Sequence, residues 1–443
     1  MKVMLASLGC DKNLVDSEMM LGILSENGFE LTNDENEAEV IVVNTCGFIQ
    51  DSKQESIDAL IEYGELKKNG TLKILVCAGC LAERYHEDIK TELPEIDIVI
   101  GTTAFDKIAE AINSYAGEHN QYLDDVEKKL VYGKKRILST GGHYAYLKIA
   151  EGCDKKCTYC AIPSIRGTFR SVPMEVLIKE AEELAIGGVK ELIIVAQETT
   201  VYGKDIYGEK KIHELIRKLC RIDGIEWIRL LYCYPEEIYD ELIDVIKEEP
   251  KVCHYLDIPI QHADDYILQR MGRRTDEKYL RNLVDKLRAA IPDICLRTTL
   301  ITGFPGEKEN HFETLKNFVR DIRFDRLGVF TYSAEDGTLA ADMEDQVEES
   351  VKEARKEEIM LLQQEIVFDK AEDKIGCEFP VIIEGRLDDG ALVARSYMDA
   401  PDVDGYVFID SDRDIESGKI IDVRITGCND YDLIGEFTDE FTE

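Results

Sequence analysis

The sequence predicts an α/β protein with three parts: a parallel-sheet domain, a β/α barrel and a small antiparallel β-barrel. Short apolar runs alternate with helical segments in residues 1–116 and again, at least six times, between about 139 and 340. From residue 371 onward, short β runs are separated by Asp/Gly turns instead. Continuous apolar strands joined by helices indicate parallel sheets that are covered on both faces.

The N-terminal part, residues 1–116, contains four predicted strands, at 3–6, 40–43, 74–76 and 96–100. An amphipathic segment at 16–27 separates the first two, which is typical of a parallel sheet with covering helices. The polar stretch 117–138 is predicted to be a linker.

The central part, residues 139–370, is predicted to form an open or closed β/α (TIM-like) barrel. Its candidate strands lie at 145–150, 191–196, 227–231, 255–260, 296–301 and 326–330. Helical patterns such as 174–186 and 276–290 lie between the strands, and one connecting helix is predicted within 344–375. Barrels of this kind carry their chemistry at the carboxyl ends of the strands.

The C-terminal part, residues 371–443, is predicted to be a small antiparallel β-barrel of a kind often used for binding. Its β runs lie at 379–383, 392–394, 406–409 and 420–425.

The composition is that of a globular protein, with 44% hydrophobic and 32% charged residues. No apolar run reaches the roughly 18 residues that a bilayer requires. The apolar start stops at Gly9 without a small-residue cleavage site, which favours a buried strand over a signal peptide. We therefore expect a cytoplasmic protein that does not associate with membranes.

Three of the 13 cysteines, Cys153, Cys157 and Cys160, form a C-x-x-x-C-x-x-C motif directly after the first predicted barrel strand. Clustered cysteines in a reducing compartment bind metal or do redox chemistry more often than they form disulfides. Iron–sulfur clusters take thiolate ligands, and three thiolates leave one iron of a four-iron cluster open. The alternative, a zinc site, usually needs paired C-x-x-C units or histidines, which are missing nearby. The motif therefore predicts a [4Fe–4S] cluster.

A second set, Cys10, Cys46 and Cys80, follows three of the predicted N-terminal strands. Residues just past the carboxyl ends of neighbouring parallel strands converge at one edge of the sheet. We therefore expect these thiols to hold a second cluster, the alternative being three isolated buried cysteines. The other seven are expected to be core residues, although Cys77 is near enough to be a stray ligand.

The segment 150–163, which contains the C-x-x-x-C-x-x-C motif, resembles the cluster loop of the radical S-adenosylmethionine superfamily. The resemblance implies that S-adenosylmethionine binds the open iron and is cleaved to a 5′-deoxyadenosyl radical. Gln197 and Glu198 end the second predicted barrel strand, where the superfamily contacts the methionine moiety. Gly303 and Gly306 resemble the glycine turn that backs the adenine.

Two three-cysteine sets and a C-terminal β-barrel resemble the methylthiotransferases over essentially the whole chain. Their parts are an N-terminal domain with an auxiliary cluster, a radical barrel and a TRAM domain. The resemblance implies two [4Fe–4S] clusters and two S-adenosylmethionine molecules per turnover, one to methylate sulfur and one to yield the radical. An electron donor and a sulfur source are also needed, and no motif identifies them.

The segments 8–18, 44–49 and 395–405 are most similar to the branch that converts an aspartate of a small-subunit ribosomal protein to 3-methylthioaspartate. The alternative is the branch that modifies adenosine in transfer RNA, which typically has Gln-Met-Asn where this chain has Asp11-Lys12-Asn13. A non-catalytic electron carrier is a third hypothesis, but it would normally have four ligands per cluster.

The net charge is −37, and residues 372–443 carry 20 acidic against 6 basic side chains. Because such a surface repels phosphate backbones, nucleic-acid binding is not expected. A basic ribosomal protein is the expected partner, with Asp399, Asp402 and Asp404 as candidate contacts on an exposed loop. The alternative is that these acids only face solvent.

Overall fold

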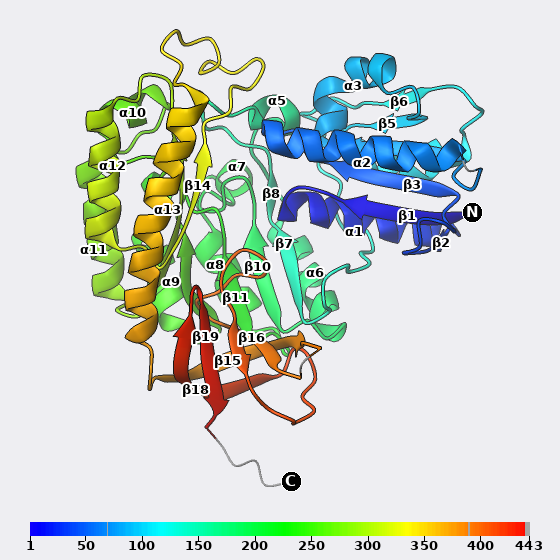
Figure 1. The fold of residues 1–443 in the computed structure, drawn as a ribbon. Helices are drawn as coiled ribbons and strands as arrows, with labels where there is room; N and C mark the ends of the chain where they lie inside the picture. The colour runs from blue at the N-terminus through cyan, green and yellow to red at the C-terminus, as the bar shows by residue number, and fades with distance from the viewer. Residues whose placement is uncertain (69, 389, 439–443) are drawn as a thin grey trace.

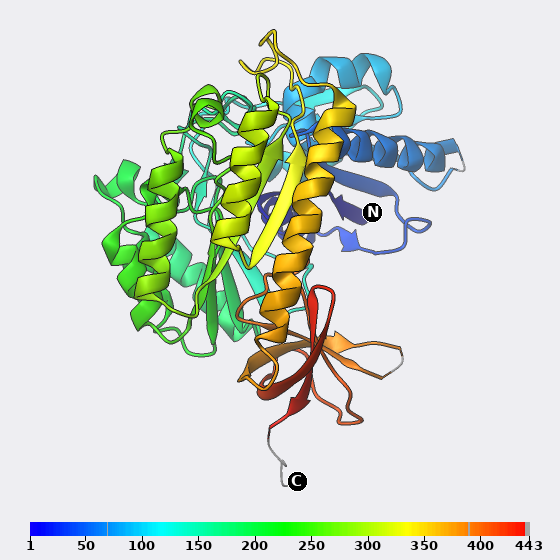
Figure 2. The same cartoon turned by 60° about the vertical axis from the view of Figure 1, so that its left-hand side comes forward.

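The computed structural model describes residues 1–68, 70–388 and 390–438, so the last five residues of the predicted C-terminal part lie outside it. An N-terminal α/β domain, a central β/α domain and a C-terminal β-barrel are arranged as Figure 1 shows. The N-terminal domain lies beside one end of the central domain, and the C-terminal barrel lies at the other (Figures 1 and 2). Among the described residues, no helix is long and apolar enough to cross a membrane.

The N-terminal domain is built on a sheet of six parallel strands in the order β2-β1-β3-β4-β5-β6. The strands are β1 (Lys2–Ser7), β2 (Glu30–Leu31), β3 (Val40–Thr45), β4 (Ile74–Gly79), β5 (Ile98–Ile100) and β6 (Asn120–Tyr122). The helices are α1 (Asp11–Glu26), α2 (Gln50–Lys68), α3 (Cys80–Glu92), the 3-10 turn η1 (Phe105–Lys107) and α4 (Ile108–Asn113). Because α1 and α4 pack on one face and α2 and α3 on the other, β3 and β4 are buried throughout.

The segment 117–138, predicted to be a linker, is part of the packed structure. It begins with β6, which extends the N-terminal sheet at its edge. Near its end, the Arg136 guanidinium lies 2.5 Å from Glu18 of α1 and 2.5 Å from Glu180 of the central domain. The segment therefore ties the two domains together.

The central domain contains six parallel strands in the order β14-β13-β12-β11-β10-β7, with open edges at β14 and β7. These strands are β7 (Tyr144–Lys148), β10 (Glu191–Val195), β11 (Trp227–Leu230), β12 (Val252–Asp257), β13 (Cys295–Thr302) and β14 (Arg326–Thr331). A short pair, β8 (Ala150–Glu151) and β9 (Arg170–Ser171), flanks the loop that holds the C-x-x-x-C-x-x-C motif.

Helices cover the outer face of this sheet. These helices are α6 (Met174–Ile186), α8 (Ile212–Leu219), α9 (Asp240–Glu248), α11 (Glu277–Ala290), α12 (Glu309–Ile322) and α13 (Glu349–Glu372). The short elements α5 (Ile162–Arg166), α7 (Lys204–Tyr207), η2 (Pro235–Glu237) and α10 (Asp265–Arg270) lie in the connections that follow the strands. The predicted connecting helix is α13, which packs along the edge strand β14 before the chain enters the C-terminal barrel.

The C-terminal barrel is closed by five strands in the order β15-β16-β17-β19-β18. They are β15 (Glu378–Arg386), β16 (Leu392–Ser396), β17 (Val407–Ile409), β18 (Ile420–Asn429) and β19 (Asp432–Phe437). The pairing is antiparallel as predicted, except that β17 and β19 run parallel.

The C-terminal barrel docks at the end of the central sheet where its strands begin, opposite to the cysteine loop (Figure 1). Glu191, the first residue of β10, accepts hydrogen bonds from Arg395 at 2.6 Å and from Arg229 at 2.7 Å. The side chains of all three are completely buried. A buried ion network therefore seals this floor of the central domain.

Two of the acidic residues assigned to a substrate-binding loop belong to the same seal. Asp399 is 1% exposed and pairs with Arg326, while the side chain of Asp404 is 2% exposed and lies 3.4 Å from Arg297. Of the three, Asp402 alone is exposed. The prediction of an exposed acidic loop is therefore wrong for Asp399 and Asp404, because arginines of the central domain neutralise their charges inside the protein.

We expect Glu191→Ala to lower the free energy of unfolding by about 3–5 kcal/mol, because it leaves the buried Arg229 without a carboxylate and Arg395 with Glu384 alone. The chain has a single tryptophan, Trp227, at the start of β11, so its fluorescence reports denaturation near the seal. The matched control is Glu378→Ala, which breaks an exposed pair with Arg424 and should cost less than about 1 kcal/mol. Equal denaturation midpoints for the two variants would contradict the stabilising role of the seal.

Candidate iron–sulfur sites

The loop after β8 places Cys153, Cys157 and Cys160 at the carboxyl end of the central sheet. Cys153 and Cys157 are buried, and Cys160 is half-buried. Gly152 has a φ of +80°, and a Cβ there would lie 2.1 Å from the carbonyl oxygen of Thr168. Only glycine fits this close approach, which holds the start of the loop against the backbone that follows α5.

Polar groups surround these thiols. The backbone N–H of Lys155 donates to Cys153 Sγ at 3.4 Å, and the Tyr234 hydroxyl lies 3.7 Å from Cys157 Sγ. Burial raises the pKa of Cys153 and of Cys160 to about 12. Such thiols release their protons when a metal compensates the thiolate charge, as a cluster ligand must.

Cys10, Cys46 and Cys80 lie just past the carboxyl ends of three neighbouring strands, β1, β3 and β4. Gly9 has a φ of +87°, and a Cβ there would lie 3.1 Å from Cys46 Sγ, so the Cys10 loop passes directly over Cys46. Burial is the main cause that raises the pKa of Cys80 to about 12; Arg166 opposes the rise, and the nearby Cys10 and Cys46 thiols add to it. The structure thus brings the three thiols together at one edge of the sheet.

Among the described residues, no three His, Cys, Asp or Glu side chains converge closely enough to bind one metal ion. The thiolates of an iron–sulfur cluster bind different irons, so they do not need to converge on one point. Cys77 is buried within β4, where its Sγ lies 3.9 Å from the Thr45 hydroxyl, and so occupies a core position.

Gln197 and Glu198 follow β10 at the same end of the central sheet as the cysteine loop. Gln197 donates to Glu151 at 2.8 Å, but its own amide oxygen is buried and has no partner among the described residues. Glu198 is 1% exposed, and burial raises its pKa to about 7. One Glu198 oxygen likewise has no hydrogen-bond partner in the described chain, and Lys155 lies 3.7 Å from it. A ligand with N–H donors would satisfy these two acceptors.

Gly303 and Gly306 form the turn after β13, with φ values of +70° and +86°. The N–H of Gly303 donates to the Glu307 carboxylate, and a Cβ on Gly303 would lie 2.1 Å from Lys352 Cγ. The close packing of this turn against α13 therefore explains the need for glycine at Gly303.

Arg273 is a residue that the sequence patterns did not single out. It is buried, its guanidinium lies 4.3 Å from the centre of the Tyr234 ring, and it donates to the carbonyl of Pro259. Its Nε and Nη1 groups have no hydrogen-bond partner among the described residues. It belongs to no motif, so only the fold shows that two free donors lie beside the cysteine loop.

Comparison with known proteins assigns the chain to a family. Family models match residues 2–101 (uncharacterized protein family UPF0004), 147–319 (radical SAM superfamily) and 375–438 (TRAM domain). The chain is 59% identical to the ribosomal protein uS12 methylthiotransferase RimO of Lachnoclostridium phytofermentans, over 98% of this chain and 99% of that one. The chain belongs to the RimO family of methylthiotransferases. RimO proteins of Acetivibrio thermocellus and Clostridium botulinum are 52% and 49% identical, each matched over 99% of its length and 99–100% of this chain.

Solved structures show the same fold as this RimO family member at low sequence identity. The radical S-adenosylmethionine methyltransferase TsrM from Kitasatospora setae superimposes with a TM-score of 0.54 and 14% identity, over 88% of this chain and 79% of that one. The cobalamin-dependent radical enzyme OxsB superimposes with a TM-score of 0.53 and 14% identity, over 77% and 54% of the two chains.

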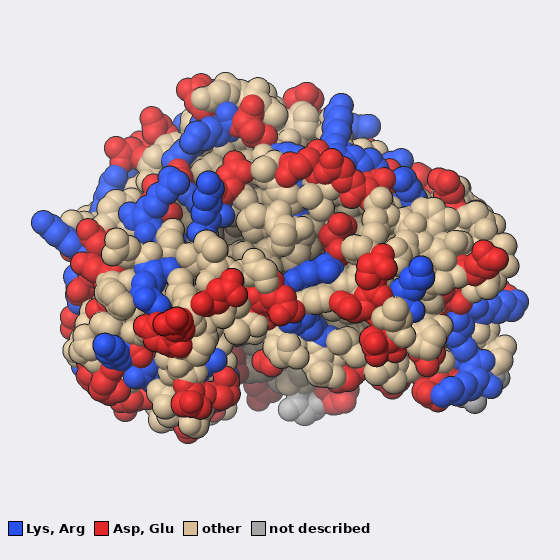
Figure 3. All heavy atoms as spheres, turned by 90° about the horizontal axis from the view of Figure 1, so that it is seen from above, with Lys and Arg blue, Asp and Glu red and all other residues tan. Residues whose placement is uncertain are grey.

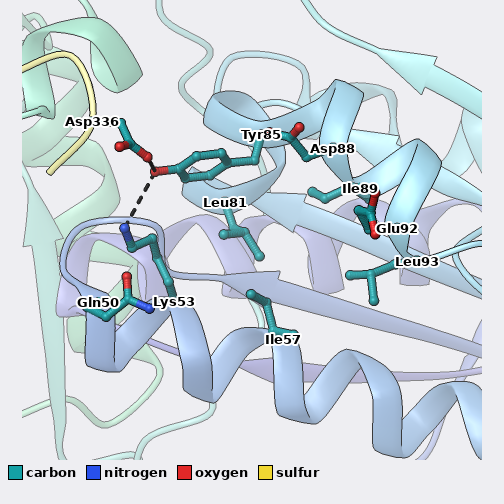
Figure 4. A pocket seen from close by; sticks show the side chains of 10 residues that line it. All are labelled: Gln50, Lys53, Ile57, Leu81, Tyr85, Asp88, Ile89, Glu92, Leu93 and Asp336. Atoms are coloured by element: carbon teal, nitrogen blue, oxygen red, sulfur yellow. Dashed lines mark hydrogen bonds between the residues drawn. The ribbon is translucent and has the colours of Figure 1, made fainter.

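A separate pocket of about 350 Å³ lies between α2 and α3 in the N-terminal domain of this RimO family member (Figure 4). Ile57 and Leu81 belong to its apolar wall, and at one end the Tyr85 hydroxyl donates to Asp336. Beside this end, Glu335 pairs with Lys53 at 2.9 Å and with Arg84 at 2.8 Å, which holds the N-terminal domain against the 333–346 loop. None of the six candidate ligand cysteines lines this pocket.

Figure 3 shows the end of the RimO family member that lies opposite to the C-terminal barrel. Acidic and basic side chains are interspersed over this face, around a central hollow. A continuous basic stripe of the kind that tracks a phosphate backbone does not cross the part of the face that is drawn.

Proposed function

We propose that the protein attaches a methylthio group to the β-carbon of an aspartate in ribosomal protein uS12. The observation that carries the proposal is the match to RimO proteins over essentially the full length of both chains. The two cysteine trios support it, because methylthiolation needs a radical generator and a sulfur donor within reach of the same substrate atom.

Cys153, Cys157 and Cys160 would hold the radical-generating [4Fe–4S] cluster, and Cys10, Cys46 and Cys80 would hold the auxiliary one. Each set offers three thiols and a loop shaped by glycine. When bound, the clusters and S-adenosylmethionine supply the reductive cleavage that makes a 5′-deoxyadenosyl radical, and the sulfur that is methylated and transferred.

Residues of the chain would bind and orient S-adenosylmethionine. The free oxygens of Gln197 and Glu198 would accept hydrogen bonds from its ammonium group, and the free N–H groups of Arg273 would donate to an anionic group. Lys155 lies close enough to Glu198 to balance part of its charge. The buried pair of Glu191 and Arg395 closes the opposite end of the sheet, where the strands begin.

Mass spectrometry of ribosomal proteins and transfer RNA, from cells with and without this gene, tests the proposal. We expect uS12 to carry a methylthio group on one aspartate only when the gene is present, and the RNA nucleosides to be the same in both. The net charge of −37 favours this outcome, since phosphate backbones are bound through basic surfaces. Loss of methylthioadenosine from the RNA, with uS12 unmodified in both strains, would refute it.

A further inference from the structure

The radical-site loop continues directly into a contact with the auxiliary thiols. Arg166, the last residue of α5, lies six positions after Cys160. Ala161 and Ile165 of the same segment form a small apolar cluster with Cys80, which begins α3 in the N-terminal domain. The two candidate cluster sites are therefore neighbours across the domain interface, and α5 is the element that joins them.

The Arg166 side chain is 2% exposed and makes four polar contacts. Its Nη2 donates to Cys80 Sγ at 3.3 Å and to the Asn13 side-chain oxygen at 2.5 Å. Its Nη1 lies 2.7 Å from Asp16 and 3.2 Å from Glu151. Partners from both domains thus fix one guanidinium against the sulfur.

The charges around Arg166 leave its positive charge available to balance a thiolate at Cys80. Lys148 pairs with the same two carboxylates, Asp16 and Glu151. Two cations therefore face two anions, and the group is neutral before Cys80 ionises. When Cys80 becomes a thiolate ligand, its negative charge meets a guanidinium that stays protonated in proteins.

We propose that Arg166 is a positioning residue of the auxiliary site: it holds Cys80 through an N–H···S hydrogen bond and raises the reduction potential of the cluster that Cys80 helps to bind. Hydrogen bonds to ligand sulfurs and nearby positive charge both favour the reduced state of an iron–sulfur cluster. The inference rests on the proposed function, because it takes Cys80 as a cluster ligand. On this proposal, a residue that follows the radical-site cysteine loop sets the reduction potential of the auxiliary cluster.

The experiment isolates the auxiliary cluster. The full chain with Cys153, Cys157 and Cys160 replaced by alanine is reconstituted anaerobically, with and without Arg166→Gln, and titrated with reductant while the reduced cluster is followed by electron paramagnetic resonance. We expect Arg166→Gln to shift the one-electron equilibrium at least tenfold towards the oxidised cluster, which is about 59 mV to more negative potential. Arg166→Lys keeps the charge without the fork of donors, so it should shift the potential less, in the same direction.

The matched control is Arg136→Gln. Arg136 is also buried, also joins α1 to the central domain through Glu18 and Glu180, and makes no cysteine contact that the structure shows. Its loss should weaken the domain interface without moving the potential. An equal shift in both variants would mean that interface loosening is the cause, and an unchanged potential in Arg166→Gln would overturn the proposal.

Iron content separates this inference from the proposed function. Wild-type iron in Cys80→Ala would defeat the ligand assignment itself, whereas a loaded cluster with an unshifted potential in Arg166→Gln would defeat only the role of Arg166. If Arg166→Gln does not assemble a cluster, Arg166→Lys is used in its place. A more negative potential in that variant supports the proposal, and an unchanged one overturns it.

Discussion

Replacing Cys153, Cys157 or Cys160 by alanine should abolish the formation of 5′-deoxyadenosine. Each substitution removes one of only three thiolates from the cluster that must bind and reduce S-adenosylmethionine. Iron should fall from about eight to about four atoms per chain, because the other cysteine set belongs to a different domain and keeps its own cluster. Chromatography of the reaction products and iron analysis of the anaerobically reconstituted variants measure both effects.

Cys233→Ala is the control for this prediction. Cys233 is also buried in the central domain, but it belongs to its hydrophobic core and to neither trio. This variant should keep its full iron content and continue to form 5′-deoxyadenosine. If Cys157→Ala loses four irons but still cleaves S-adenosylmethionine normally, this trio is not the site of the radical chemistry.

Replacing Cys46 by alanine should stop methylthiolation while reductive cleavage of S-adenosylmethionine continues. Cys46 lies at the centre of the N-terminal trio, and the Cys10 loop passes directly over it. Its loss removes the sulfur donor but leaves the radical site on the central domain intact. Mass spectrometry of one reaction should therefore detect 5′-deoxyadenosine but no methylthiolated uS12.

Cys77→Ala provides the comparison within the same sheet. Cys77 is buried in β4, three residues before Cys80, so its substitution costs packing without touching a proposed ligand. This variant should retain both clusters and form product. Wild-type product from Cys46→Ala would remove that residue from the auxiliary site.

Much of the architecture was predictable because buried parallel strands must be apolar on both faces. This holds for β3, β4 and the central strand β10, whose apolar runs stand out in the sequence. By contrast, β6 (Asn120–Tyr122) is a polar edge strand, and the sequence around it resembles a linker. The meeting of three cysteines 34 or more positions apart was predictable too, because parallel topology gathers strand ends at one edge.

What could not be predicted depends on how domains dock. Asp399 and Asp404 look like surface acids in a loop with proline and glycine, and only the arginines of the central sheet explain their burial. Arg166 and Arg273 likewise belong to no recognised spacing, since their partners come from distant segments. Side chains that act across an interface carry no periodic signal in the sequence.

The ion network on the floor of the central domain limits how this protein can be recombined. A C-terminal barrel taken from another methylthiotransferase would bring its own residue to the place of Arg395. Without a cation there, the completely buried carboxylate of Glu191 would keep only Arg229. A chimera that exchanges this barrel to alter the substrate of the enzyme must therefore also exchange the residues at the start of the central strands, which contact the barrel. The C-terminal barrel and the end of the central sheet that it contacts therefore form one structural unit, and the barrel cannot be exchanged alone.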